Sequence, residues 1–91
     1  MAEQETSLYS VVLLNDDKTP MEFVVRVLQN YFAMDWETAK QKMFFIHRYG
    51  AGECGRYDFE LAKEKAAAIV AFARQHNHPL ECTIEKVSLG T

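Results

Sequence analysis

Apolar residues along the chain fall into six successive stretches with the spacing of regular secondary structure. Short runs rich in β-branched and aromatic residues predict strands, and longer runs with apolar residues three or four positions apart predict helices. The predicted strands are 9–14, 53–57 and 80–87, and the predicted helices are 20–31, 36–48 and 59–75. The order β-α-α-β-α-β predicts an α/β fold, an α+β sandwich with three helices packed on a small three-stranded antiparallel sheet.

Polar residues at the predicted helix starts are typical caps. Thr19 is expected to be the N-cap of the first helix, with Pro20 at the first helical position and Glu22 completing a capping box. Asp35 and Asp58 are expected to cap the second and third helices. These signals place a helix start directly after the first strand and its short polar turn.

The ends and inner faces of the helices can also be predicted. Gly50 and Gly52 are expected to end the second helix, since glycine is common at and after a C-cap. Helical spacing predicts one buried stripe on the third helix. Its members are Leu61, Ala62, Ala66, Ile69, Val70 and Ala73.

The 91 residues suffice for one small domain. We expect a core at 9–87 between flexible tails at 1–8 and 88–91. Hydrophobic residues make up 48% and charged residues 25%, as in ordinary globular proteins. The net charge of −3 gives no basic field for nucleic acid, and no apolar run approaches the length of a membrane span. A monomeric cytoplasmic protein is therefore expected, with no nucleic-acid or membrane partner.

Three turn-forming residues, Asn15, Asp16 and Asp17, stand between the first strand and the first helix. Their side chains concentrate hydrogen-bond acceptors in one short turn. One interpretation is a structural turn in which these side chains bond the following backbone amides. The other is a site for a cation or an ammonium group, and the residues alone leave both open.

Two pairs of apolar residues could line one small cavity near this turn. Met21 and Val24 share a face of the first helix, and Met43 and Ile46 share a face of the second. His47, which follows Ile46, could donate or accept a hydrogen bond near neutral pH. The alternative is that the four apolar residues are plain core and that the histidine is satisfied locally.

Metal, cofactor and catalytic sites are not indicated. His76, His78, Cys54 and Cys82 match no tetrahedral zinc spacing, and the cysteines are expected to be small buried residues without a disulfide. No nucleophile elbow or phosphate-binding glycine loop is present in the sequence. We expect no metal and no cofactor, and the sequence favours binding over enzymatic catalysis.

Four motifs together resemble the ClpS adaptor family, and they span nearly the whole predicted core. Residues 15–24 read NDDKTPMEFV and residues 39–47 read AKQKMFFIH. Residues 54–55 read CG and residues 78–85 read HPLECTIE. Most of the resemblance rests on the first block together with Met43 and the pair Ile46-His47 of the second block.

The resemblance implies a non-enzymatic adaptor of regulated proteolysis. ClpS-like proteins bind substrates that begin with Leu, Phe, Tyr or Trp, the bacterial N-degron. They deliver these substrates to the N-domain of a ClpA-type AAA+ unfoldase that works with the ClpP peptidase. Eight residues precede Tyr9, fewer than the extension with which family members generally engage the unfoldase.

The resemblance also assigns expected roles to individual residues. Asn15, Asp16 and His47 would hold the substrate α-ammonium group, and Asp17 would support them. The side-chain pocket would be lined by Thr19, Met21, Val24, Met43, Ile46 and Leu80, with Met21 excluding β-branched first residues. Unfoldase docking would involve Glu60, Lys65, Tyr49 and Arg48.

Some positions depart from the family pattern, and the residues also leave two other functions open. Lys18 replaces a frequent aromatic residue, and Phe44-Phe45 is bulkier than the common Leu-Ala. One alternative is a protein–protein docking domain like that of the ribosomal stalk. Such a domain would still bind its partner after Asp16 is replaced by alanine. The other is a small hydrolase using Asp16, Asp17 and His47, which lacks a nucleophile or a full ligand set.

Overall fold

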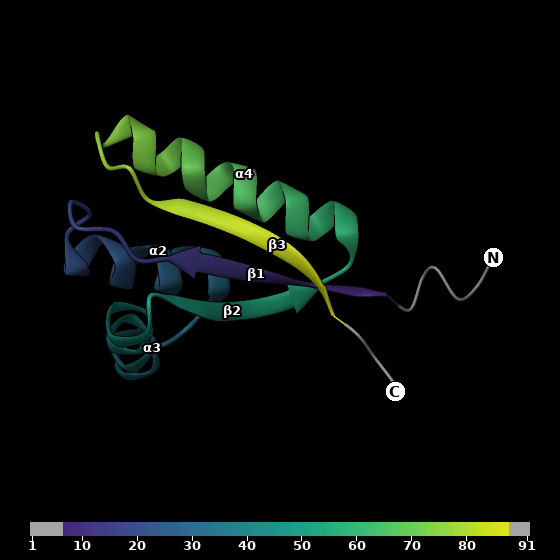
Figure 1. The fold of residues 1–91 in the computed structure, drawn as a ribbon, viewed down its shortest axis with the longest axis horizontal. Coiled ribbons are helices and arrows are strands. Elements are labelled where there is room, and N and C mark those ends of the chain that lie inside the picture. Colours follow the sequence, from purple (N-terminus) through teal and green to yellow (C-terminus); the bar gives the residue numbers. More distant parts are fainter. Residues whose placement is uncertain (1–6, 88–91) are drawn as a thin grey trace.

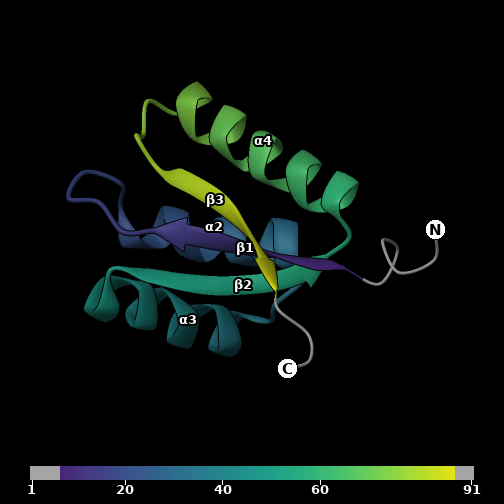
Figure 2. The same ribbon diagram turned by 45° about the vertical axis from the view of Figure 1, so that its right-hand side comes forward.

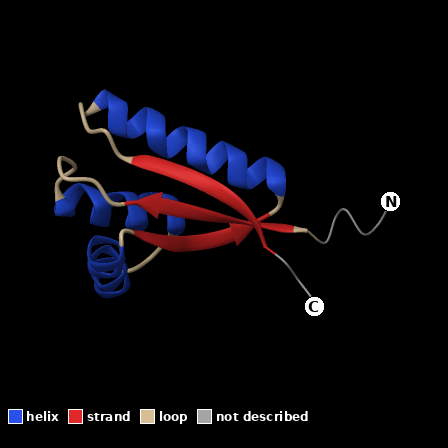
Figure 3. Ribbon diagram, in the orientation of Figure 1, coloured by secondary structure: helices blue, strands red, loops and turns tan. Residues whose placement is uncertain are grey.

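The strand β1, Leu8–Leu14, is the centre of a three-stranded sheet in the computed structural model, which describes residues 7–87. It pairs antiparallel with β2, Ala51–Tyr57, on one side and with β3, Glu81–Val87, on the other. Val11 faces Gly55 across one ladder and Ile84 across the other. The predicted three-stranded antiparallel sheet is confirmed, and the first strand is its centre (Figure 3).

Three helices complete the predicted β-α-α-β-α-β order: α2, Met21–Phe32; α3, Trp36–Tyr49; and α4, Phe59–Gln75. In two views, α2 lies behind β1, α4 runs along the β3 edge and α3 lies by the β2 edge (Figures 1 and 2). The turn between β1 and α2 lies at the same end of the molecule as the junction of α3 with β2 (Figure 1). This arrangement brings the polar turn close to the last residues of α3.

The core forms where β1 meets the inner faces of the helices. Val11 and Leu13 alternate along β1 and are completely buried. Val27 and Leu28 of α2 and Ile69 of α4 are also completely buried. Each such side chain contributes roughly 1.5–3 kcal/mol when it leaves water, so this layer fixes the helices on the sheet.

Two of the three predicted helix caps are confirmed. Asp35 and Asp58 each accept a 2.8 Å hydrogen bond from the backbone N–H three residues later. The prediction for the first helix was wrong, because its N-cap is Pro20, which makes no side-chain capping bond. The Thr19 hydroxyl is instead directed toward Asp16, to whose Oδ2 it donates.

Gly50 alone ends α3, with a left-handed φ of 91°. The expectation that Gly52 shares this role was wrong, because Gly52 lies within β2 and is buried. A Cβ at Gly52 would lie 2.7 Å from Cγ1 of Ile46, so its small size lets β2 approach α3 closely. Leu61 also differs from its prediction: it is 42% exposed, while Ala62 beside it is buried.

The predicted tails, 1–8 and 88–91, lie outside the described residues except for Ser7 and Leu8, and Leu8 begins β1. Cys54 and Cys82 are free and half-buried. Burial raises the pKa of Cys54 to about 11 and that of Cys82 to about 12, so both remain thiols at neutral pH. They were predicted to be small buried residues without a disulfide; they form no disulfide but are only half-buried.

Candidate functional site

The polar turn after β1 is organised around the carboxylate of Asp16. Its Oδ1 accepts hydrogen bonds from the backbone N–H groups of Lys18, at 2.8 Å, and Thr19, at 2.7 Å. Its Oδ2 accepts a bond of 2.8 Å from the Thr19 hydroxyl. These bonds show that the structural interpretation of the turn is correct as far as Asp16 is concerned.

The same bonds keep Asp16 ionised without saturating it. Partial burial opposes ionisation, but the bonds from the Thr19 hydroxyl and from the two backbone amides outweigh it and lower the pKa of Asp16. A carboxylate offers about four acceptor positions. Three are occupied here, and Oδ2 accepts only one of these bonds. Asp16 can therefore stabilise the turn and still offer one free hydrogen-bond acceptor position on a negatively charged oxygen.

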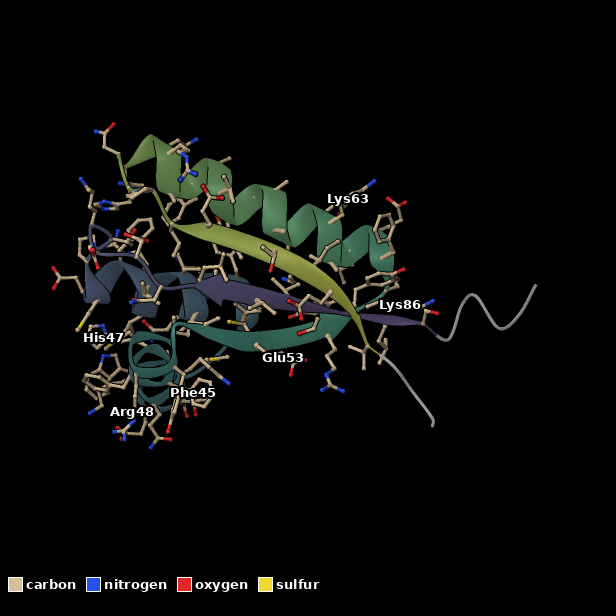
Figure 4. All side chains as sticks on the ribbon, in the orientation of Figure 1. Phe45, His47, Arg48, Glu53, Lys63 and Lys86 are labelled. Atoms are coloured by element: carbon tan, nitrogen blue, oxygen red, sulfur yellow. The ribbon has the colours of Figure 1, made fainter. Side chains whose placement is uncertain are left out.

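Asn15 connects this turn to the end of α3. Its backbone N–H donates to the carbonyl oxygen of Gly50 at 2.9 Å, and the Gly50 N–H in turn donates to Ile46 at 2.8 Å. Figure 4 shows His47 at this end of α3. The connection places the imidazole and the acidic turn around one opening, although they are about thirty residues apart in the chain.

That opening leads into a cavity of about 280 Å³. It is smaller than the roughly 300–1,000 Å³ typical of pockets for drug-sized ligands, so it suits a single amino-acid side chain. Nine of the ten predicted amine-site and side-chain-pocket residues line it: Asn15, Asp16, Asp17, Thr19, Met21, Val24, Met43, Ile46 and His47.

Polarity changes from the rim of the cavity to its interior. Asn15 and His47 are exposed at the rim. Met43 and Ile46, in contrast, are only 6% and 2% exposed. Met21 is 43% exposed, which places a flexible apolar side chain beside the entrance. The cavity can therefore accept a group that is charged at one end and apolar at the other.

Leu80 is the one predicted pocket residue that does not line the cavity. It is 1% exposed and belongs to the hydrophobic core with Leu13 and Ile69. Sequence reasoning also missed the carbonyl of Gly50, which holds the turn through Asn15. A backbone contact of this kind leaves no trace in the residue pattern, beyond the glycine that permits the left-handed end of α3.

The four predicted docking residues do not form one surface. Glu60 is exposed near the start of α4, whereas Arg48 and Tyr49 are exposed at the end of α3. Figure 4 shows Lys63, one turn after Glu60, far from Arg48. The expected docking residues therefore lie in two separate regions of the surface, one on α4 and one at the end of α3.

The side chain of Lys65 contacts other elements of the protein. Its Nζ donates to the carbonyl oxygen of Tyr31 at 2.6 Å, and it lies 5.3 Å from the ring centre of Tyr57 and 5.7 Å from that of Phe32. These contacts tie α4 to the end of α2. Lys65 therefore has a structural contact in addition to the docking role expected of it, and it remains partly exposed.

The described residues, 7–87, contain neither a candidate metal site nor a helix that could span a membrane. Within that range, no three His, Cys, Asp or Glu side chains come together as a possible metal site. His78 instead packs against Phe23, with 4.5 Å between ring centres, and His76 does so at 5.5 Å. No helix in the same range is both long and apolar enough to cross a bilayer.

Comparison with known proteins gives consistent matches. Residues 4–83 match the family described as ATP-dependent Clp protease adaptor protein ClpS. The chain is 51% identical over 80 residues to the Clp protease adapter protein ClpS 2 of Rhodopseudomonas palustris, covering 88% of this chain and 73% of the relative. It is 50% identical over 80 residues to ClpS 1 of Agrobacterium fabrum, covering 88% of this chain and 68% of the relative.

A solved structure matches the fold as well. Agrobacterium tumefaciens ClpS2 bound to L-phenylalaninamide superimposes with a TM-score of 0.86 at 36% identity. The match covers 89% of this chain and 98% of the other. The ligand in that structure combines an amine with an aromatic side chain, which is the combination of groups that the cavity described above can accept.

Proposed function

The chain belongs to the ClpS family of Clp protease adaptors, and we propose that its cavity binds the first residue of substrates that begin with Leu, Phe, Tyr or Trp. In this proposal the substrate side chain enters the apolar interior while its free amine stays at the polar rim. The observation that supports it most strongly is the placement of Asp16 and His47 at the mouth of a cavity closed by Met43 and Ile46.

The rim matches the chemistry of a protein N-terminus. An α-ammonium group carries one positive charge and three N–H donors. Asp16 offers a carboxylate oxygen, Asn15 offers an amide oxygen, and a neutral imidazole at His47 offers a nitrogen acceptor. Asp17, which also lines the cavity, adds negative charge at the exposed side of the turn. An internal residue of a chain has no such amine, so the rim distinguishes a terminus from a loop.

The energetics require both parts of the site. Each charge-assisted hydrogen bond contributes about 1.5–3 kcal/mol net, and burial of a Phe or Leu side chain contributes about 1.5–3 kcal/mol. Two or three such contributions, less the cost of ordering the peptide, correspond to an affinity of around micromolar. A terminus with a small side chain, or a large side chain with a blocked amine, should bind much more weakly.

Met21 is proposed to select among first residues. It lies beside Thr19 and Val24 on the cavity wall and is the most exposed apolar residue there. A side chain that branches at Cβ is widest next to the backbone, where it would meet Met21 at the entrance. Leu, Phe, Tyr and Trp do not branch at Cβ, so their side chains leave that space free.

Delivery forms the second half of the proposal. As a family member, the adaptor would hand its substrates to the N-domain of a ClpA-type unfoldase coupled to ClpP, in the cytoplasm, and would catalyse no reaction itself. Exposed Glu60 on α4 and the exposed pair Arg48 and Tyr49 on α3 remain two separate candidate contact regions. Lys65, whose ammonium group donates to the backbone carbonyl of Tyr31, is proposed as a further contact of the α4 region.

A degradation assay tests recognition and delivery together. A fluorescent reporter that begins with Phe would be incubated with ClpA, ClpP and ATP, with and without the adaptor, beside the same reporter beginning with Ser. We expect the adaptor to accelerate loss of the Phe reporter only. Equal rates for both reporters in the presence of the adaptor would contradict the proposal.

A further inference from the structure

A second apolar hollow lies between α2 and α3, next to the cavity already described. Its volume is about 420 Å³. The side chains that define its outer part are large and open to solvent: Trp36 is 56% exposed and Phe44 is 51% exposed. Its α2 wall includes Val25 and Arg26. Exposed aromatic residues in a hollow are a common feature of binding sites.

The two hollows adjoin and share a pair of methionines. Met21 and Met43 line both of them. Along α3 the lining moves from Met43 and His47 in the first hollow to Lys40 and Phe44 in the second. This shift is three residues, or roughly 4.5 Å along the helix axis.

An extended peptide is long enough to reach from the first hollow into the second. Side chains of an extended chain alternate between two faces, so residues 1 and 3 point the same way and lie roughly 6.6 Å apart. When residue 1 occupies the first cavity, residue 3 comes within reach of Phe44 and Trp36 across the ridge made by Met21. Residue 2 points away from this surface.

We propose that this second hollow is a subsite for the third residue of the substrate and that it favours a large apolar side chain there. The inference rests on the proposed function, because the first residue must be anchored for the third to be placed. Methionine side chains adapt to apolar guests of different shape. Trp36 and Phe44 add aromatic faces on which such a guest can pack.

The charges around the second hollow add a further preference. Arg26 and Lys40 outnumber Glu22 among the lining residues, so the hollow has a net positive charge. The Lys40 ammonium group lies over one face of the Trp36 ring, 4.2 Å from its centre, and 3.8 Å from a carboxylate oxygen of exposed Glu37. A Lys or Arg at substrate position 3 should therefore be disfavoured relative to a neutral polar residue.

Peptides of the form Phe-Ser-X-Ser-Gly-Ser-Lys(fluorescein) measure the effect by fluorescence anisotropy. X would be Ser, Lys, Leu, Phe or Trp. Partial burial of a large apolar side chain predicts affinity about threefold to tenfold higher for Leu, Phe or Trp than for Ser. Moving Phe from position 3 to position 2, with Ser at position 3, should remove most of that gain.

Two neighbouring phenylalanines provide matched variants on one helix. Phe44→Ala should abolish most of the gain while binding of the X = Ser peptide persists. Phe45 is exposed to a similar extent, at 47%, but it lines neither hollow and stacks on Tyr49. Phe45→Ala should therefore retain the full gain.

The outcomes separate the two proposals. If the X = Ser peptide binds but affinity does not depend on X, or if Phe44→Ala keeps the gain, the subsite is contradicted and first-residue recognition stands. If no peptide with a free Phe terminus binds, both proposals are contradicted. A gain at position 3 that Phe44→Ala removes and Phe45→Ala leaves intact supports the subsite.

Discussion

The backbone N–H of Asn15 donates a 2.9 Å hydrogen bond to the carbonyl oxygen of Gly50. This single bond joins the turn that follows β1 to the residue that ends α3. Gly50 adopts a φ of 91°, which directs its carbonyl away from the helix. The geometry of the polar rim therefore depends on a glycine that touches no ligand.

A Gly50→Ala variant should destabilise the protein by about 1 kcal/mol, since a left-handed backbone is unfavourable for residues with a Cβ. Open space surrounds this position, so the effect should come from the backbone alone. Urea denaturation measures it. Gly50→Asn should cost less because asparagine tolerates this conformation better. Equal stability of Gly50→Ala and wild type would show that the left-handed conformation is not required.

Replacing Asp16 should separate its structural role from its charge. Asp16→Asn retains a carbonyl oxygen for the two backbone amides but removes the charge offered to the ammonium group. Asp16→Ala removes both. We expect affinity for a Phe-peptide to fall by roughly tenfold or more in Asp16→Asn, the value of a charge-assisted bond, and to fall further in Asp16→Ala. If Asp16→Asn binds as tightly as wild type, the carboxylate charge has no part in recognition.

The stability contributed by Asp16 should depend on pH. Its pKa is lower in the folded protein than the ordinary value of 3.8, so ionisation favours the folded state. The contribution is fully present above the unfolded pKa and is lost as pH falls through the folded pKa. The stability difference between wild type and Asp16→Asn should therefore be constant from pH 7 to 5 and shrink below about pH 4.

Urea denaturation at several pH values measures this difference. Asp17→Asn is the matched control, because Asp17 is the exposed neighbouring carboxylate in the same turn. If the stability difference between wild type and Asp16→Asn grew as pH falls, the prediction would be contradicted.

Shortening Met21 should relax selection at the first residue. Exclusion by one or two methyl groups in an apolar pocket is worth roughly tenfold or more, so Met21→Ala should raise the affinity of Val- and Ile-peptides by about that factor. Competition binding against a labelled Phe-peptide measures the change. Asn30→Ala, an exposed change on the same helix, is the control. Unchanged rejection of Val by Met21→Ala would remove the proposed gating role.

The order and bounds of the elements could be predicted because local signals agree with the packed structure. Asp35 and Asp58 cap their helices as expected, since their side chains find only the nearby backbone amides. Thr19 misled the prediction because its hydroxyl had two possible partners within the same turn. Asp16 binds it, and a capping motif cannot reveal such local competition.

The site was predictable where its residues follow each other at helical or turn spacing. Met43, Ile46 and His47 lie on one end of α3, so finding them together required only the helix period. Leu80 and Lys65 were assigned through the resemblance, and their tertiary contacts could not be predicted from the residue pattern. Leu80 is enclosed by the core, and Lys65 bonds Tyr31 of another helix.

The second hollow could have been suspected from the chain. Trp36, Lys40 and Phe44 recur every four residues on α3, which places them on one face. This face differs from the one that carries buried Ala39 and Met43. Such a stripe indicates an exposed aromatic surface, but only the packed structure shows that it adjoins the first cavity through Met21.

The central claim is that a free amine and a bulky side chain are recognised together at the rim formed by Asn15, Asp16 and His47. Fluorescence anisotropy with one Phe-initiated peptide, compared with its N-acetylated form, tests it most directly. Acetylation removes the positive charge and two of the donors but leaves the aromatic ring, so we predict a loss of at least about tenfold in affinity. Equal binding of the two peptides would contradict the account.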